Sequence, residues 1–257
     1  MANWVFKGLA SGVVTTRYPH RMEEIPGGWS GLPVVRGGNC PPECRQCAQA
    51  CPSGAIESGP AGPRIDYMRC LFCRECVENC PAEVLVWRND FRLARLNRRG
   101  EPSRRFSKRS VYIRHVDTGA CESCLWEVNG LSNPYYDLHR LGFFFVTSPR
   151  HADLLLVTGP VTRNMADALD KAYRAMPAPK LVVAAGTCAC SGSFAGVNYA
   201  APYRLADLLP VDVFIPGCPP APLTLLHGLL LAVGRLKEAE DTRMTTGGGE
   251  AAGVAGK

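Results

Sequence analysis

The 257-residue chain lacks any apolar run of the roughly 18 residues that a transmembrane helix needs. It also lacks a secretory signal, because Lys7 interrupts the apolar stretch 4–14 and no small-residue cleavage site follows. We therefore expect a cytoplasmic chain with no membrane span of its own, in which thiols stay reduced. Charged residues are 20% and hydrophobic residues 46% of the chain, which argues against a disordered or fibrous protein.

Signals for binding nucleotides or nucleic acid are also missing. The stretch 192–196 contains two glycines but not the spacing of a phosphate-binding loop. The chain is basic, with a formal net charge of +6, and ten Lys or Arg residues fall in 88–114. No stacking aromatics alternate with them, as single-strand binding requires. We therefore expect no nucleic acid partner, and interpret this run as a linker or an arm that docks on acidic lipid or a partner subunit.

Cysteine, in contrast, is abundant, with 13 residues, eight of them within 39–87. Four of the eight have the ferredoxin spacing C-x2-C-x2-C-x3-C-P: Cys70, Cys73, Cys76 and Cys80. An upstream run differs only by one extra residue after its first cysteine: Cys40, Cys44, Cys47 and Cys51. In paired runs the fourth cysteine binds the other cluster. We therefore predict two [4Fe–4S] clusters, one on Cys40, Cys44, Cys47 and Cys80, the other on Cys70, Cys73, Cys76 and Cys51.

Structural zinc is the alternative for these eight cysteines, since zinc also binds C-x2-C pairs. Zinc needs only four ligands and has no use for two C-x2-C-x3-C-P runs, so the pattern favours iron–sulfur clusters. About fifty residues bury little core, and we expect this segment to fold only with its clusters bound.

The second half has the pattern of an α/β domain, with short apolar runs between longer helical patterns. The predicted strands are 111–116, 143–146, 153–158, 181–185 and 211–215, and the predicted helices are 161–175 and 221–237. This alternation predicts a mostly parallel sheet covered on both faces.

Four later cysteines each follow the end of a predicted strand: Cys121, Cys124, Cys188 and Cys218. Because parallel strands end at one edge of a sheet, we expect these thiols to converge on one crevice and hold a third cluster. Gly186 and Gly217 suit the close approach of the backbone to a bulky group. We interpret Cys190 as a small buried residue or one that lies behind the ligands, and not as a ligand itself. Unrelated core cysteines are the alternative.

Other polar or amphipathic features are weaker. Val5, Leu9 and Val13 have helical spacing and could face a membrane surface, a membrane subunit, or the protein itself. The histidines at 115, 139, 151 and 227 are scattered, and we expect ordinary polar or interface roles for them.

Together, these motifs resemble two neighbouring subunits of one class of complex. Five stretches resemble the cluster-bearing small subunit of group 4 energy-converting [NiFe] hydrogenases, including formate hydrogenlyase, which is related to the 20 kDa subunit of respiratory complex I. They are CESCLWE (121–127), SPRHAD (148–153), VTG (157–159), GTC (186–188) and VDVFIPGCPP (211–220). The first half, with GVVTTRYP at 12–19, resembles the two-cluster ferredoxin subunit of the same complexes. The chain therefore resembles a fusion of the two.

The resemblance implies that Cys121, Cys124, Cys188 and Cys218 hold the cluster nearest a partner's active site. Glu127 matches an acidic residue near that cluster, either a proton relay or a hydrogen-bond partner of the loop. The spacing Cys121-x-x-Cys124 favours the hydrogenase side, since the complex I subunit has adjacent cysteines there. The family's Gly-rich stretch is altered at 189–192.

The resemblance also implies the function. The chain is expected to be a non-catalytic electron-transfer subunit with three [4Fe–4S] clusters, relaying electrons to or from a hydrogenase-like large subunit. Other hydrophilic and membrane subunits of the complex would hold it on the inner face of the cell membrane. A quinone-reducing, complex I-like assembly without nickel is the alternative.

The expected fold is an α+β ferredoxin-like two-cluster domain fused to an α/β flavodoxin-like domain with a mostly parallel sheet. The expected organisation begins with an N-terminal amphipathic docking segment (1–38) and a ferredoxin-type domain (39–88). A basic linker (89–110), a 20 kDa-like cluster domain (111–240) and a disordered tail (241–257) follow.

Overall fold

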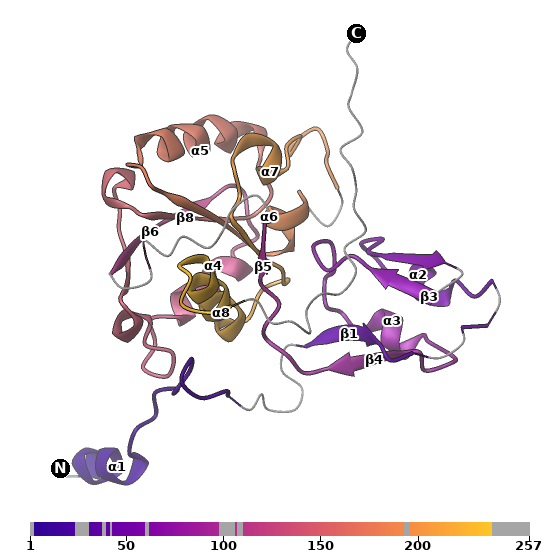
Figure 1. Ribbon diagram of the computed structural model, residues 1–257, viewed down its shortest axis with the longest axis horizontal. Helices are drawn as coiled ribbons and strands as arrows, with labels where there is room; N and C mark the ends of the chain where they lie inside the picture. The colour runs from indigo at the N-terminus through magenta and orange to yellow at the C-terminus, as the bar shows by residue number, and fades with distance from the viewer. Residues whose placement is uncertain are drawn as a thin grey trace.

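The computed structural model describes most of the chain in two parts that lie side by side (Figure 1). The described residues are 3–23, 31–37, 40–41, 43–59, 62–97, 106, 110–192 and 196–237. The tail 241–257, expected to be disordered, lies outside them.

The larger part is built on a six-stranded sheet with the order β5-β10-β9-β8-β6-β7. Its strands are β5 (Arg95–Leu96), β6 (Val111–Asp117), β7 (Phe143–Phe145), β8 (Leu154–Thr158), β9 (Leu181–Ala185) and β10 (Val213–Ile215). All neighbours are parallel except β5, which runs antiparallel to β10. The central strands β8 and β9 are buried along their whole length, as continuous apolar runs predict. The prediction of a mostly parallel sheet is confirmed.

Helices cover both faces of this sheet (Figure 1). One face packs on α4 (Ser123–Gly130) and α8 (Pro222–Ala232), and the other on α5 (Arg163–Ala175), α6 (Thr187–Ser191) and α7 (Leu205–Leu208). Leu154 and Leu156 of β8 point to the first face, whereas Leu155 and Val157 point to the second. Two short 3-10 turns, η2 (Leu138–Leu141) and η3 (Pro149–His151), flank β7.

The smaller part contains two antiparallel strand pairs and two short helices. The elements are β1 (Leu32–Val35), α2 (Gln46–Gln49), β2 (Ile56–Gly59), β3 (Gly62–Ile65), α3 (Glu75–Glu78) and β4 (Leu85–Arg88), with β1 on β4 and β2 on β3. Cysteines make up much of its core, where Cys47 and Cys76 pack with Leu32 and Leu85. We refer to this part as the ferredoxin half and to the larger as the α/β half.

The structure differs from the expected organisation at two places. Strand β1 lies within 1–38, the segment expected only to dock, and completes the ferredoxin half by pairing with β4. Within the expected linker 89–110, Phe91 and Ala94 are buried in the core of the α/β half, and β5 extends its sheet. The stretch is rich in Lys and Arg, and its few apolar residues, which are the ones that pack, form no regular strand pattern.

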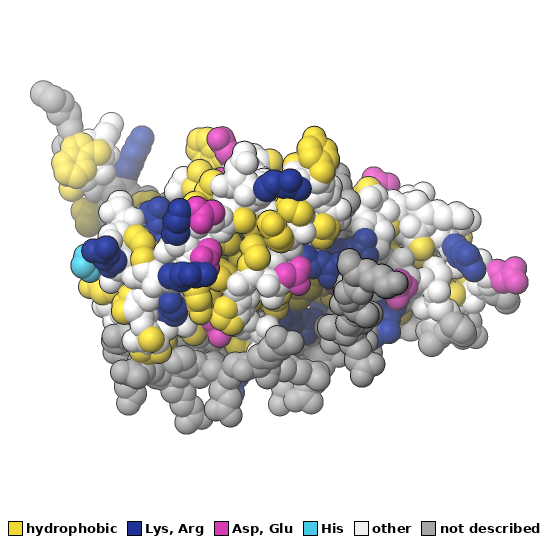
Figure 2. Space-filling model, turned by 90° about the horizontal axis from the view of Figure 1, so that it is seen from above, with side chains coloured by type: hydrophobic (Ala, Val, Ile, Leu, Met, Phe, Trp, Pro, Cys, Tyr) yellow, Lys and Arg dark blue, Asp and Glu magenta, His cyan; other side chains and the backbone are white. Residues whose placement is uncertain are grey.

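The N-terminal helix α1 (Asn3–Ser11) stands apart from both halves, and none of its residues is buried (Figure 1). Its hydrophobic side chains lie open at one end of the molecule, beside the chain start (Figure 2). No helix among the described residues is both long enough and apolar enough to cross a membrane.

Candidate iron–sulfur sites

One cavity in the ferredoxin half is lined by four cysteines: Cys51, Cys70, Cys73 and Cys76. Burial raises the pKa of the Cys70 thiol to about 12, with smaller contributions from the nearby thiols of Cys76, Cys51 and Cys73. The amide of Phe72 donates to Cys70 Sγ at 3.3 Å, and that of Ala55 to Cys51 Sγ at 3.2 Å. Such N–H to sulfur bonds stabilise metal-bound thiolates.

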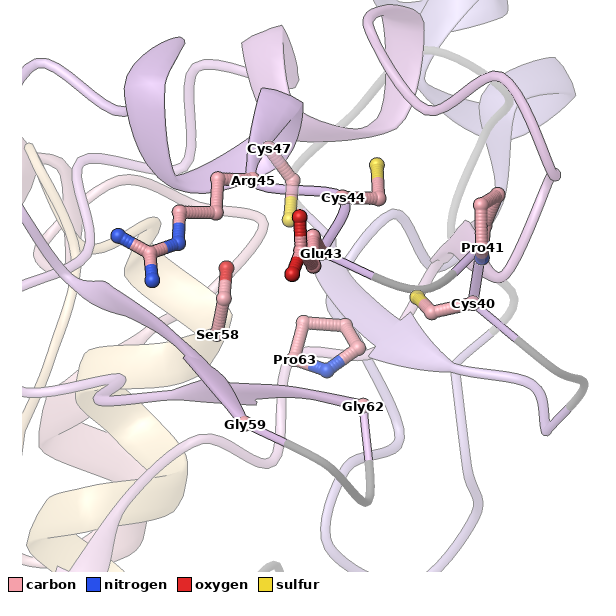
Figure 3. Close-up of a pocket in the computed structure, with 10 residues that line it drawn as sticks. All are labelled: Cys40, Pro41, Glu43, Cys44, Arg45, Cys47, Ser58, Gly59, Gly62 and Pro63. Atoms are coloured by element: carbon pink, nitrogen blue, oxygen red, sulfur yellow. The ribbon is translucent and has the colours of Figure 1, made fainter.

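A second cavity, of about 280 Å³, is lined by Cys40, Cys44 and Cys47 (Figure 3). The sulfurs of Cys40 and Cys47 point to the space beside Glu43, whereas that of Cys44 points away from Pro63. Burial raises the pKa of Cys47, and the charges of Cys80, Cys40 and Cys44 add to the rise. The assignment of Cys80 to this set stays a prediction of the crossover rule.

The third set lies at the carboxyl ends of β6, β9 and β10. Cys124 lies in the first turn of α4, Cys188 in α6, and Cys218 follows β10. Burial raises the pKa of Cys124 to about 12, with smaller contributions from Cys188, Cys218 and Cys121. Cys121 is exposed, and a hydrogen bond with the Ser123 hydroxyl lowers its pKa. The sheet thus brings together four cysteines that are distant in sequence.

The loops that carry the cysteines are tightly curved. Four non-glycine residues beside cysteines have left-handed φ angles: Glu43 (64°), Phe72 (56°), Arg74 (71°) and Glu122 (68°). Residues other than glycine adopt this conformation at a cost of about 1–2 kcal/mol, and such residues gather at functional sites. Each cysteine loop therefore keeps a conformation that local preferences disfavour.

Gly186 provides space beside the third set. A Cβ atom at this position would lie 2.8 Å from Cys124 Sγ, and φ is +94°. Gly217 is also constrained, since a Cβ atom there would lie 2.4 Å from Cα of Pro220. Only glycine leaves the room that four converging sulfurs need.

Cys190 lies behind the third set. Its thiol points to the carbonyl oxygen of Ala184 at 3.7 Å, and burial raises its pKa. Burial also raises the pKa of Glu127 in α4, which favours its protonated form.

Two of the histidines lie within hydrogen-bond distance of a hydroxyl group. His115 Nε2 lies 2.8 Å from the Thr158 hydroxyl, and His227 Nδ1 lies 2.6 Å from the Tyr18 hydroxyl. Across the described part of the chain, no three His, Cys, Asp or Glu side chains form a group able to hold a single metal ion.

Two interactions connect the three sets. The charge of Cys47, from the first set, acts on Cys76 of the second. The Thr187 hydroxyl donates to the carbonyl oxygen of Cys70 at 2.8 Å, which joins the second set to the third. The sequence gives no sign of this contact, because a single threonine in the GTC stretch has no spacing that points to Cys70.

These features define an iron–sulfur protein with a ferredoxin-type half and an α/β half. A family model described as 4Fe-4S dicluster domain matches residues 39–84. A second, described as NADH ubiquinone oxidoreductase, 20 Kd subunit, matches residues 121–232.

Two curated proteins are similar to this chain. "Probable membrane-bound hydrogenase subunit mbhJ" of Pyrococcus furiosus is 43% identical over 151 residues, which is 58% of this chain and 89% of that protein. "Formate hydrogenlyase subunit 7" of Escherichia coli is 41% identical over 131 residues, 51% of each protein, so the chain spans about half of its length. The chain therefore belongs to the family of the 20 kDa NADH–ubiquinone oxidoreductase subunit and its hydrogenase relatives, which confirms the resemblance predicted from the motifs.

A solved structure is also similar. It is a chain of the membrane-bound sulfane sulfur reductase, an archaeal respiratory membrane complex, with 30% sequence identity and a TM-score of 0.44. The match covers 55% of this chain and 83% of that chain.

Proposed function

We propose that the chain is the electron-transfer subunit of a hydrogenase- or formate hydrogenlyase-like oxidoreductase complex and holds three [4Fe–4S] clusters. The observation that carries the proposal is the grouping of twelve cysteines into three sets of four. The ligand sets are Cys40, Cys44, Cys47 and Cys80; Cys51, Cys70, Cys73 and Cys76; and Cys121, Cys124, Cys188 and Cys218.

The residues around each set suit such a group. When bound, a [4Fe–4S] cluster accepts and releases one electron at a potential set by hydrogen bonds and burial. The chain supplies thiolate ligands, amide donors such as those of Phe72 and Ala55, and at least one buried cysteine in each set. Iron replaces the protons that burial would otherwise keep on Cys70 and Cys124.

The order of the sets supports a relay. The second set has a link to each of the other two. Cys47 of the first set acts electrostatically on Cys76 of the second, and the Thr187 hydroxyl, beside Cys188 of the third set, donates to the carbonyl oxygen of Cys70. The third set is open at Cys121 and Cys218, and Trp126 nearby is exposed. We infer that this face meets the large subunit, and that electrons enter or leave through the ferredoxin half.

Two finer features of the fold belong to this proposal. Strands β6 to β10, numbered by chain order, follow the sequence 2-1-3-4-5 of flavodoxin-like sheets, in which ligands bind at the carboxyl ends of the strands. In the smaller part, the paired cysteine runs lie among short helices and strand pairs, which supports an α+β ferredoxin-like fold there. We also propose that helix α1 docks the chain to the inner face of the cell membrane or to a membrane subunit.

Spectroscopy and metal analysis of the purified complex test the function. The proposal expects about twelve iron and twelve sulfide per chain. A colourless, zinc-loaded protein would contradict it. Nickel in the complex supports the hydrogenase-like assembly, which the Cys121-x-x-Cys124 spacing favours. Its absence, together with quinone reductase activity, supports the complex I-like alternative.

A further inference from the structure

The junction between the second and third cysteine sets centres on one hydroxyl group. Thr187 is 1% exposed and lies at the start of α6, directly before Cys188. Its hydroxyl donates to the carbonyl oxygen of Cys70 at 2.8 Å, across 117 positions of sequence. Its amide donates to the carbonyl oxygen of Gly217, the neighbour of Cys218, also at 2.8 Å. Thr187 is thus bonded to the Cys70 loop and to the Cys218 loop, and it directly precedes Cys188 in the third loop.

The loop that follows Cys70, whose carbonyl oxygen accepts this hydrogen bond, needs such a contact. Residues 71–74 belong to no helix or strand, and Phe72 and Arg74 hold left-handed φ angles. Such a segment gains little from its own backbone hydrogen bonds, so its position depends on outside contacts. The Cys70 carbonyl oxygen is one point where the α/β half holds this loop. A buried hydroxyl-to-carbonyl bond is short and directional, and therefore fixes position more sharply than apolar packing.

We propose that Thr187 is a positioning residue that holds the Cys70 loop against the Cys188 and Cys218 loops and thereby fixes the separation of the second and third cysteine sets. This inference rests on the proposed function, because the separation matters only if both sets hold clusters. The two halves of the chain have different folds and separate cores. A rigid joint between them is what a relay across their boundary requires.

Three variants of the full complex test the proposal. Thr187→Val removes the hydroxyl and keeps the branched shape, whereas Thr187→Ser keeps the hydroxyl. Thr118→Val is the matched control, because the Thr118 hydroxyl also donates to a buried carbonyl, that of Thr158, at 2.8 Å within the α/β half. It removes the same kind of bond without touching the junction.

The first measurement is amide hydrogen exchange of residues 70–74, followed by mass spectrometry. Loss of the hydroxyl is expected to speed exchange there by about fivefold to tenfold in Thr187→Val. Thr187→Ser and Thr118→Val are expected to exchange there as the wild type does. The second is the magnetic interaction between the two reduced clusters by electron paramagnetic resonance, which depends on their separation. It is expected to weaken or broaden in Thr187→Val only.

Iron content separates failure of this inference from failure of the proposed function. If the wild type lacks the third cluster, the proposed function fails, whatever the variants do. If all proteins hold about twelve iron ions and Thr187→Val matches the wild type in exchange and in magnetic interaction, the positioning role is overturned. If Thr187→Val loses a cluster, Thr187→Ser decides: retention of the cluster supports the role of the hydroxyl, and its loss overturns it.

Discussion

The hydroxyl group of Tyr18 lies 2.6 Å from Nδ1 of His227, and both side chains are buried. Tyr18 comes from the N-terminal segment and His227 from the middle of α8. The ring of Phe91, from the connection between the two halves, meets Tyr18 edge-on at 5.2 Å between ring centroids. Arg140 also donates to the Tyr18 carbonyl oxygen at 2.8 Å. Four segments distant in sequence therefore meet at this pair.

The Tyr18–His227 pair predicts a pH dependence of stability. Burial lowers the pKa of His227 to about 4, with a further lowering from Arg92 and an opposing effect of Asp90. The unfolded chain, with a His pKa near 6.5, then binds more protons than the folded chain below that pH. The contribution of neutral His227 is complete above about pH 6.5 and falls by roughly 2 kcal/mol by about pH 5. Thermal unfolding of the cluster-loaded protein at pH 7.5 to 5 measures it.

His227→Gln is the comparison for this prediction, since glutamine does not titrate. The variant is expected to be less stable at pH 7.5 and to lose less stability on acidification than the wild type. Equal pH profiles for the two proteins would show that His227 is not the titrating group. Tyr18→Phe removes the partner hydroxyl and is expected to lower stability by about 1 kcal/mol at neutral pH.

Gly186→Ala is predicted to disrupt the third site. The new Cβ would lie 2.8 Å from Cys124 Sγ, so the sulfur or the loop must move. Gly37→Ala is the matched control, because φ is +91° there and nothing lies within 4 Å of the added atom. Both variants share the backbone cost, and only Gly186→Ala is expected to lose the third cluster signal in paramagnetic resonance. Survival of that signal would contradict the crowding argument.

Exchange of the fourth cysteines between the two ferredoxin runs gives a third prediction. Cys51 lines the cavity of Cys70, Cys73 and Cys76, and the charge of Cys80 acts on Cys47. Cys51→Ser is therefore expected to perturb the spectrum of the second cluster, and Cys80→Ser that of the first. Cys190→Ser serves as the control and is expected to leave about twelve iron ions bound. If Cys51→Ser instead perturbs only the first cluster, each run binds its own cluster.

Features that depend on residues close together in sequence could be predicted, whereas those that depend on distant partners could not. Cysteine spacing is a local property, and strand ends follow from apolar runs, so the sequence predicts where the cysteine loops lie, whereas the three ligand sets stay a prediction. Strand β5 could not, because two residues in a basic stretch carry no strand pattern and pair only where β10 offers an edge. Thr187 and Tyr18 were missed for a related reason. Their partners, Cys70 and His227, lie 117 and 209 positions away, and one hydroxyl has no spacing that reveals its partner.

Helix α1 carries the last prediction, which concerns membrane association. Trp4 and Phe6 are 76% and 67% exposed, Leu9 is also exposed, and no acidic residue occurs in 1–22. Aromatic and aliphatic side chains with basic neighbours are typical of segments that lie in a membrane interface. Trp4→Ser together with Phe6→Ser is expected to weaken binding of the full complex to membranes at least about tenfold, because two large side chains no longer leave water. Sedimentation with vesicles containing anionic lipid, and with native membranes, measures the change.

The matched control for this variant is Tyr199→Ser, which removes an aromatic ring that is 88% exposed on the α/β half. It is expected to bind membranes as the wild type does, with both variants keeping about twelve iron ions. Binding to protein-free vesicles that depends on Trp4 and Phe6 identifies lipid as the surface that α1 meets. Dependence seen only with native membranes identifies a membrane subunit instead. Unchanged binding in both assays would exclude α1 from membrane association, and the exposed faces of the two halves would then have to supply it.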